Sequence, residues 1–313
     1  MAEKRINLTI LTLGVIIGVV LGAQAIDYIK SSMFVPKFAV AKTDAPVLHT
    51  PDWTQVFATG SGLKLDSDET VGEMEFIALP GTAFTILGKE THKGNTYYKV
   101  STGDVPDLDP ADGLAYWVDA RFVATSDTKP AERVRIKPDA ETVKANLMKG
   151  LGARYIWGGN KLAGIPELLT MYAPGKEIPA DIKDKWMLRG VDCSGFLYEA
   201  TGGYTPRNTG DIIKFGSGMT IAGQSAAQIK AQLKPLDLIV WRGHLMIVLD
   251  NNKTIESRHD YDLNTPEFEG GVRIRDLDYV LEETLSRRVA VDDYDDEVPA
   301  DKKKFVIRRW IEA

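Results

Sequence analysis

The chain has 313 residues, which is ample for two hydrophobic cores, and 44% of them are hydrophobic. Its formal net charge of −6 argues against a nucleic-acid-binding protein, because such proteins carry a basic surface. A single cysteine excludes an intramolecular disulfide framework.

The first 25 residues have the pattern of an export segment. Lys4 and Arg5 precede an uncharged run over 6–26, and Ala23-Gln24-Ala25 is a small-x-small cleavage signal. We expect a cleaved secretory signal over 1–25 or, because the run is long enough to cross a bilayer, an uncleaved transmembrane anchor. No cysteine follows the run, so a lipoprotein anchor is excluded.

The region 46–124 has an all-β pattern, between a tether at 26–45 and a Pro-rich, charged linker at 125–138. Short apolar or alternating segments separated by turn residues predict strands at 82–88, 96–100 and 115–118. The segment Tyr116-Trp117-Val118-Asp119-Ala120-Arg121-Phe122-Val123 resembles the end of bacterial SH3-like barrels. The resemblance implies a small β-barrel that binds wall peptides, packs beside a catalytic cleft, or only spaces and stabilises.

Residues 139–313 have an α+β pattern. Helices are expected at 140–149, from Cys193 to about Ala200, at 225–233 and at 276–284. Strands are expected at 236–241, 245–249, 254–257, 271–275 and 304–310.

The single cysteine stands in Val191-Asp192-Cys193-Ser194-Gly195-Phe196, at the start of a predicted helix. The positive end of a helix macrodipole favours thiolate over thiol, which makes Cys193 a candidate nucleophile. The alternative is a buried cysteine that acts as a small hydrophobe. A nucleophile needs a partner base, and of the four histidines only His244 and His259 follow Cys193. His244 lies between two apolar runs of strand length.

Five motifs in this order resemble the NlpC/P60 cell-wall peptidases over roughly residues 140–313. They are Tyr155-Ile156-Trp157-Gly158-Gly159, Asp192-Cys193-Ser194-Gly195-Phe196, Pro206-Arg207-Asn208-Thr209, Lys234-Pro235-Leu236-Asp237-Leu238-Ile239-Val240-Trp241 and Gly243-His244. The resemblance implies a papain-like catalytic domain in which Cys193 is the nucleophile and His244 the general base. Donors near the start of the Cys193 helix would form the oxyanion hole.

The third catalytic group departs from the commonest family pattern, in which a second histidine lies about a dozen residues after the first. That position is Glu256 here, on a strand that returns after a turn at 250–253. A loop with an odd number of residues, at 251–253, would put Glu256 on the same face as His244. A two-residue turn at Asn251-Asn252 would instead put His259 opposite His244. We favour Glu256 and keep His259 as the alternative.

Four residues are candidates for substrate binding. Tyr155 matches a family position whose hydroxyl lies beside the cysteine, and it is otherwise a core tyrosine. Asp192 matches an acidic position that contacts the substrate amine, or it is the N-cap of the Cys193 helix. Ser194, next to the nucleophile, and Arg207, in a matched motif, complete the set.

Two further segments carry expectations. The long connection over 160–191 is expected to be a lid that narrows the cleft. The acidic segment 292–297 is expected to be a solvated loop, and we expect neither a metal nor a cofactor.

The sequence therefore predicts an exported cysteine peptidase that works in the periplasm or cell envelope. The N-terminal segment could anchor it to the inner membrane. It would hydrolyse an amide bond in peptidoglycan stem peptides through a thioester. The resemblance alone implies that this bond joins D-glutamyl to the diamino acid. The alternatives are an amidase or acyltransferase with the same Cys-His chemistry, and a non-catalytic wall-binding protein. The oligomeric state is left open.

Overall fold

The computed structural model describes residues 35–58, 62–67, 69–105, 115–259 and 270–312. The expected export segment at 1–25 lies outside these residues. Within the described ranges, no helix combines the length and apolar character needed to cross a membrane.

The N-terminal part of the chain forms a seven-stranded sheet in which every pairing is antiparallel. In spatial order its strands are β5 (Met74–Ala78), β2 (Ala45–Leu48), β8 (Tyr116–Asp119), β7 (Asn95–Ser101), β6 (Ala83–His92), β1 (Phe38–Ala41) and β9 (Val123–Ser126). Short elements accompany it: α2 (Trp53–Val56), η2 (Ala120–Phe122), and the pair β3 (Phe57–Ala58) and β4 (Gly62–Leu63). The three strands predicted in this region are present as β6, β7 and β8.

The expected tether at 26–45 is wrong for its last residues, because β1 lies inside it. β1 pairs with both β6 and β9, and its Ala39 and Ala41 are buried in the core. Small apolar residues alternating with larger ones fit a strand with one buried face. At the other end, β9 extends two residues into the expected linker.

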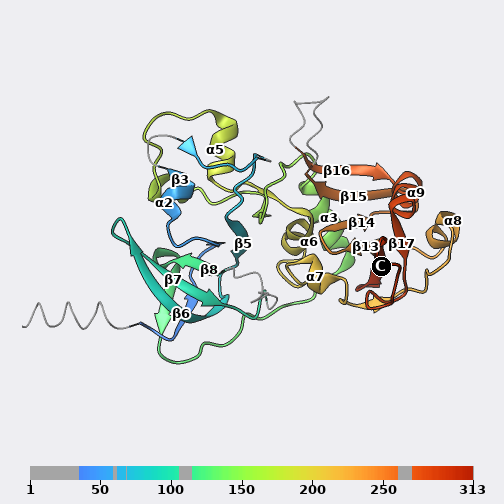
Figure 1. Ribbon diagram of the computed structural model, residues 1–313, viewed down its shortest axis with the longest axis horizontal. Coiled ribbons are helices and arrows are strands. Elements are labelled where there is room, and N and C mark those ends of the chain that lie inside the picture. Colours follow the sequence, from blue (N-terminus) through green and yellow to red (C-terminus); the bar gives the residue numbers. More distant parts are fainter. Residues whose placement is uncertain (1–34, 59–61, 68, 106–114, 260–269, 313) are drawn as a thin grey trace, which may run out of the picture.

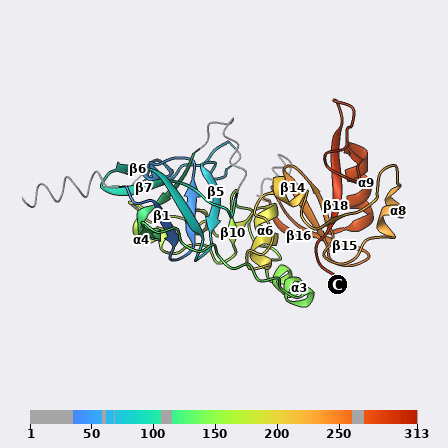
Figure 2. The same cartoon turned by 90° about the horizontal axis from the view of Figure 1, so that it is seen from below.

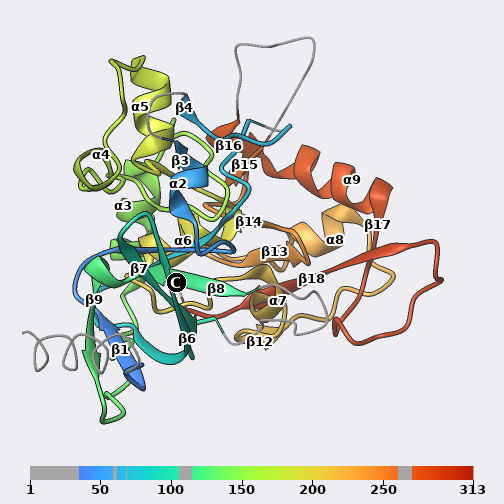
Figure 3. The ribbon, with the colours of Figure 1, turned by 60° about the vertical axis from the view of Figure 1, so that its left-hand side comes forward.

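The long connection before Cys193 packs into the N-terminal core, which contradicts the expected lid. It contains β10 (Asn160–Lys161), α4 (Leu168–Met171), α5 (Ala180–Trp186) and β11 (Gly190–Val191). Tyr172 and Trp186 join the same apolar cluster as Trp53 and Phe57, and the Phe57 and Tyr172 rings stack at 5.2 Å. Figures 1 and 3 show α5 beside α2 and β3. The aromatic side chains of this connection complete the N-terminal core. Because they are buried, the connection is fixed in place and is not a mobile lid.

The C-terminal part forms a second sheet. Its strands run in the order β12 (Ser217–Gly218), β18 (Lys303–Arg309), β13 (Leu238–Trp241), β14 (His244–Val248), β15 (Lys253–Arg258) and β16 (Gly271–Asp276), and β17 (Arg288–Ala290) pairs in parallel with β18. The helices are α3 (Ala140–Lys149), α6 (Cys193–Ala200), α7 (Thr209–Ile212), α8 (Ala226–Lys230) and α9 (Leu277–Arg287). The mixed α and β composition predicted for 139–313 is present.

Alternation along the strands buries both faces of this sheet. Leu245 and Ile247 of β14 share a cluster with Cys193 and α6, whereas Met246 and Val248 pack with α9. Figure 2 shows α6 between the N-terminal sheet and the second sheet. The Cys193 helix therefore lies where the two halves meet.

Side chains of the expected linker, 125–138, bond to both the N-terminal and the C-terminal part of the molecule. Arg133 and Arg135 both form ion pairs with Asp104, at 3.3 and 2.8 Å. Arg133 also donates to the Tyr198 hydroxyl of α6 and to the Gly203 carbonyl. This part of the chain therefore fixes α6 against the N-terminal sheet.

Candidate active site

Cys193 is the first residue of α6. Asp192 is the N-cap, as one of the two sequence interpretations had it, and its Oδ1 accepts the Gly195 N–H at 2.6 Å. Gly195 is required because a Cβ there would lie 2.0 Å from the Gly159 carbonyl oxygen. The start of the helix is thereby held tightly against the Tyr155–Gly159 loop.

The expected thiolate is not the resting state of Cys193. Burial raises the pKa of the thiol, the Asp192 carboxylate adds to the rise, and the result is about 12 in spite of Arg207. Backbone N–H groups of Ser194 and Leu245 face the sulfur but do not offset burial. The helix start is therefore outweighed by desolvation, and the sulfur is protonated at neutral pH.

His244 is paired with Glu256. The imidazole Nε2–H donates to Glu256 Oε2 at 2.6 Å. The register confirms the odd-numbered turn, since Ile247 pairs with Ile255 and Val248 with Thr254. Even-numbered residues of β14 and β15 therefore share a face, as predicted. Because Nε2 faces the carboxylate, Nδ1 carries the lone pair that can accept a proton.

Glu256 is a buried carboxylate surrounded by cations. Arg275 Nη1 donates to its Oε1 at 3.1 Å, and Arg273 Nε lies 3.5 Å from the same oxygen. Burial alone would raise the pKa of Glu256, but the hydrogen bond and charge of His244, together with Arg275, lower it to about 2. The carboxylate is therefore ionised at neutral and at mildly acidic pH.

His259, the alternative third residue, lies against another group. Its ring centroid is 5.2 Å from that of Tyr155. Since His244 donates its N–H to Glu256, the geometry favours Glu256 as the group that orients the imidazole. His259 instead forms part of the cleft wall.

Cys193 and His244, the candidate nucleophile and base, are neighbours but are not hydrogen-bonded to each other. The Leu245 N–H that faces the Cys193 sulfur belongs to the residue after His244. Among the described residues, no hydrogen bond joins the sulfur to the imidazole. Catalytic hydrogen bonds often tighten only when substrate binds, so this arrangement is compatible with proton transfer.

Tyr155 lies near the nucleophile, as the resemblance implied. It forms a β-bridge with Val191, two residues before Cys193. Burial raises the pKa of Tyr155, and the neighbouring Asp192 and Cys193 raise it further. Its hydroxyl is therefore a neutral hydrogen-bond donor.

Direct substrate contact by Arg207 does not fit the structure. The side chain is buried, and its N–H groups are directed at protein acceptors: Asn160 Oδ1, both carboxylate oxygens of Asp192, Ser194 Oγ and the Gly159 carbonyl. The ion pair with Asp192 measures 2.6 Å. Asp192 and Ser194 belong to the same network, so these three residues hold the start of α6. Substrate contacts by Asp192 and Ser194 stay predictions.

Asn160 was not identified from the sequence and connects this network to the N-terminal sheet. Its side-chain amide pairs with the backbone of Ile77 in β5, accepting from N–H and donating to C=O at 2.9 Å each. Its Oδ1 also accepts from Arg207 at 3.1 Å. A buried asparagine has no periodic sequence signal, so only the three-dimensional contact reveals its role.

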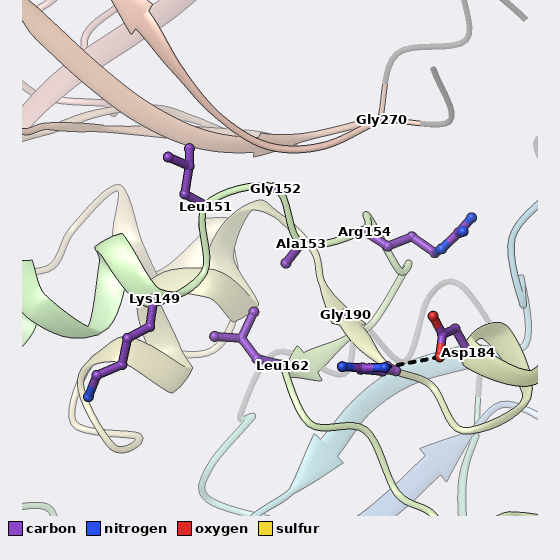
Figure 4. A pocket seen from close by; sticks show the side chains of 10 residues that line it. Lys149, Leu151, Gly152, Ala153, Arg154, Leu162, Asp184, Gly190 and Gly270 are labelled. Atoms are coloured by element: carbon purple, nitrogen blue, oxygen red, sulfur yellow. Dashed lines mark hydrogen bonds and ion pairs between the residues drawn. The ribbon is translucent and has the colours of Figure 1, made fainter. Parts of the chain in front are cut away.

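A cavity of about 340 Å³ lies next to His244. It is lined by Tyr155, Trp157, Trp241, Gly243, His244, Met246, Arg258, His259, Glu283, Thr284, Arg287 and Arg288. Trp157 is half exposed there, and it and the arginines are site residues that the sequence did not single out. A larger hollow of about 650 Å³, shown in Figure 4 with the Asp184–Arg189 ion pair, includes neither Cys193 nor His244.

No cluster of three or more metal-ligating side chains is present in the parts of the chain that the structure describes. In the acidic segment 292–297, Asp292 accepts backbone N–H groups of Ile221 and Ala222, and Asp295 pairs with Lys214 at 2.8 Å. These carboxylates serve loop structure.

Comparison with known proteins gives a relative and several solved structures, although no family model matches the sequence. The chain is 25% identical over 233 residues, 70% of its length, to the gamma-D-glutamyl-L-lysine dipeptidyl-peptidase of Bacillus subtilis strain 168, and it spans 60% of that protein's length. An NlpC/P60 family protein of Bacillus cereus ATCC 10987 is 16% identical, with 88% of this chain and 64% of that one covered and a TM-score of 0.32. The chain is similar to NlpC/P60 peptidases.

NlpC2 of Trichomonas vaginalis gives a further match, at 13% identity and a TM-score of 0.29, covering 89% of this chain and 74% of that one. These NlpC/P60 proteins are the ones to which the five sequence motifs pointed. The roles of Cys193, His244 and Glu256 remain predictions that the geometry supports.

Proposed function

We propose that the chain is a cysteine peptidase that hydrolyses an amide bond in peptidoglycan stem peptides. The observation that carries the proposal is the hydrogen bond between His244 and the buried, ionised Glu256, next to the helix that begins at Cys193. A nucleophile, a base and a group that orients the base are the parts that acyl transfer needs.

The reaction begins with a neutral thiol. As the sulfur attacks the substrate carbonyl, His244 Nδ1 takes its proton, because a thiol with a pKa of about 12 is not ionised beforehand. The imidazolium, stabilised by Glu256, then donates that proton to the leaving amine as the C–N bond breaks. A thioester remains on Cys193, and water deprotonated by His244 hydrolyses it to the acid and free thiol.

Two kinds of donor are placed to stabilise the oxyanion. The first backbone N–H groups of a helix have no partner within the helix, and the Ser194 N–H of α6 faces the Cys193 sulfur. Tyr155, which is bridged to Val191 two residues before Cys193, has a neutral hydroxyl that can donate to an oxygen that develops negative charge. Both act only as the tetrahedral state forms, which is where stabilisation raises the rate.

The bond is proposed to join D-glutamate to the following diamino acid. Support comes from the name of the Bacillus subtilis relative, which specifies a γ-D-glutamyl-L-lysine bond. The expected export segment suits a substrate in the cell envelope. The N-terminal sheet, proposed to be SH3-like, would form one side of the site, since β5 is bonded to Asn160.

Digestion of purified peptidoglycan tests the function. The wild-type protein should release stem fragments, Cys193→Ala should release none while staying folded, and His92→Ala, a substitution far from the site, should act as wild type. Undiminished release by Cys193→Ala would refute the assignment. Mass spectrometry with an added amine separates hydrolysis from acyl transfer. Slow alkylation of the resting thiol would not argue against an enzyme, given its raised pKa.

A further inference from the structure

The cavity beside His244 has an excess of positive charge. Among the lining residues that the structure describes, Arg258, Arg287 and Arg288 are cations and Glu283 is a carboxylate. Glu283 is already shared, because Arg275 lies 2.8 Å, Arg287 3.2 Å and Arg258 3.9 Å from its oxygens. The chain as a whole has a net charge of −6, so these guanidinium groups give the cavity a charge of the opposite sign.

Arg288 is the least compensated of these cations. Within the described residues, no carboxylate lies at ion-pair distance from it, and its guanidinium carbon is instead 4.0 Å from the centroid of the Trp241 ring. Burial lowers the pKa of Arg288, as expected for a partly desolvated cation. A guanidinium held in this way gains from an incoming carboxylate, which it can bind with two parallel hydrogen bonds.

The position of Arg288 relative to His244 defines which end of a substrate it would meet. The Trp241 ring contacts both, since its centroid is 5.4 Å from that of the His244 ring and 4.0 Å from the guanidinium carbon of Arg288. His244 is the group that protonates the leaving amine in the proposed reaction, so the amine fragment lies on its side of the scissile bond. A leaving side chain that enters the cavity beside His244 would meet Trp241 and Arg288, which line it together with His244.

We propose that this part of the cleft selects a leaving diamino acid whose side chain carries a free carboxylate, with Arg288 as the main contact and Arg287 in support. The proposal rests on the proposed peptidase function. A side chain that ends in an ammonium group alone, as in lysine, would meet the same arginines as a like charge. This chain is thereby expected to differ from the relative whose name specifies L-lysine.

Three synthetic tripeptides test the proposal. Each is L-Ala-γ-D-Glu followed by meso-diaminopimelate, by the same residue with its side-chain carboxylate amidated, or by L-lysine. The amide keeps the shape and removes the charge. Wild-type protein should cleave the free acid with a kcat/KM about 10- to 100-fold above the amide and the lysine peptide, the range for a charged hydrogen bond.

Arg288→Gln should bring the ratio of acid to amide close to one, and Arg288→Lys should restore part of it. The ratio is measured within each variant, so a general loss of folded protein cancels. Arg189→Gln, which removes the same charge outside this cavity, should leave the ratio unchanged. Equal cleavage of acid and amide by wild type, or an unchanged ratio in Arg288→Gln, would overturn the proposal. Failure to cleave any of the three would instead count against the peptidase function.

Discussion

At the residue scale, two buried acids with opposite environments determine where charge resides in the site. Cys193 has a carboxylate, Asp192, as its neighbour, and the pKa of its thiol rises to about 12. Glu256 is also buried. His244 and Arg275 contact its carboxylate, however, and its pKa falls to about 2. Burial acts in the same direction on both groups, so the charges around them decide the outcome. The negative charge therefore rests behind the imidazole and not on the sulfur.

The depressed pKa of Glu256 predicts an acid-sensitive contribution to stability. The carboxyl titrates near 4.5 when unfolded and near 2 when folded, so its stabilising effect is complete above about pH 4.5 and is lost as the pH falls toward 2. Glu256→Gln lacks this term. The difference in unfolding free energy between the two proteins should therefore shrink by on the order of 3 kcal/mol from pH 7 to pH 2. Urea titrations at a series of pH values measure it, and a constant difference would contradict the pairing.

At the scale of the element, α6 is placed by contacts at its first turn. A helix of eight residues is too short to be stable by itself, so packing and capping fix its position. The Asp192 cap, the Arg207 network and the glycine contacts all act within a few residues of the nucleophile. The same residues that resemble substrate contacts in sequence therefore act as the support of the helix.

Gly195→Ala should disrupt this placement. The added methyl group would lie 2.0 Å from the Gly159 carbonyl oxygen and 3.0 Å from Asp192 Oδ1, so α6 must shift away from the loop that carries Tyr155. We expect a loss of about 1–3 kcal/mol in unfolding free energy together with a strong loss of peptidase activity. Gly88→Ala is the matched control, since its methyl group would make an ordinary 3.6 Å contact with Lys99. Equal effects of the two substitutions would argue against this packing.

At the scale of the whole molecule, the segment between the first and second motifs belongs to the N-terminal core. Its Tyr172 hydroxyl donates to Asp119 at 2.5 Å, and its Trp186 Nε1–H donates to the Tyr172 carbonyl. The two ends of the segment pair with each other as β10 and β11. Ser257 of β15 donates to the Val191 carbonyl of β11, which ties this end to the second sheet. The chain thus crosses between the halves more than once, and we expect them to unfold together.

Trp186→Ala should lower the stability of the entire molecule. Removing a fully buried indole costs about 3–5 kcal/mol, and the contact of β11 with Ser257 of β15 couples that cost to the second sheet. Differential scanning calorimetry should show one transition that moves to lower temperature, whereas Ile136→Ala, at an exposed linker site, should leave it in place. A split into two transitions, of which the second keeps the wild-type temperature, would show that the halves are independent.

Much of the local structure could be predicted because it depends on neighbours in sequence. The helix over Ala140–Lys149, the start of α6 at Cys193 and the strands that flank His244 have periodic apolar patterns and capping residues. The turn between β14 and β15 likewise predicted that His244 and Glu256 share a face. The order of the five motifs indicated the family resemblance.

The sequence by itself therefore determined the elements, the candidate nucleophile and base, and the preferred third residue. Only the tertiary structure decided the protonated state of Cys193, the supporting role of Arg207 and the place of the segment before Cys193 in the N-terminal core. It alone also gathered Arg287 and Arg288 beside His244. The physical reason is that helices and turns follow from residues a few positions apart, whereas burial, ion pairing and a charge surplus depend on residues that meet only after the sheets have packed.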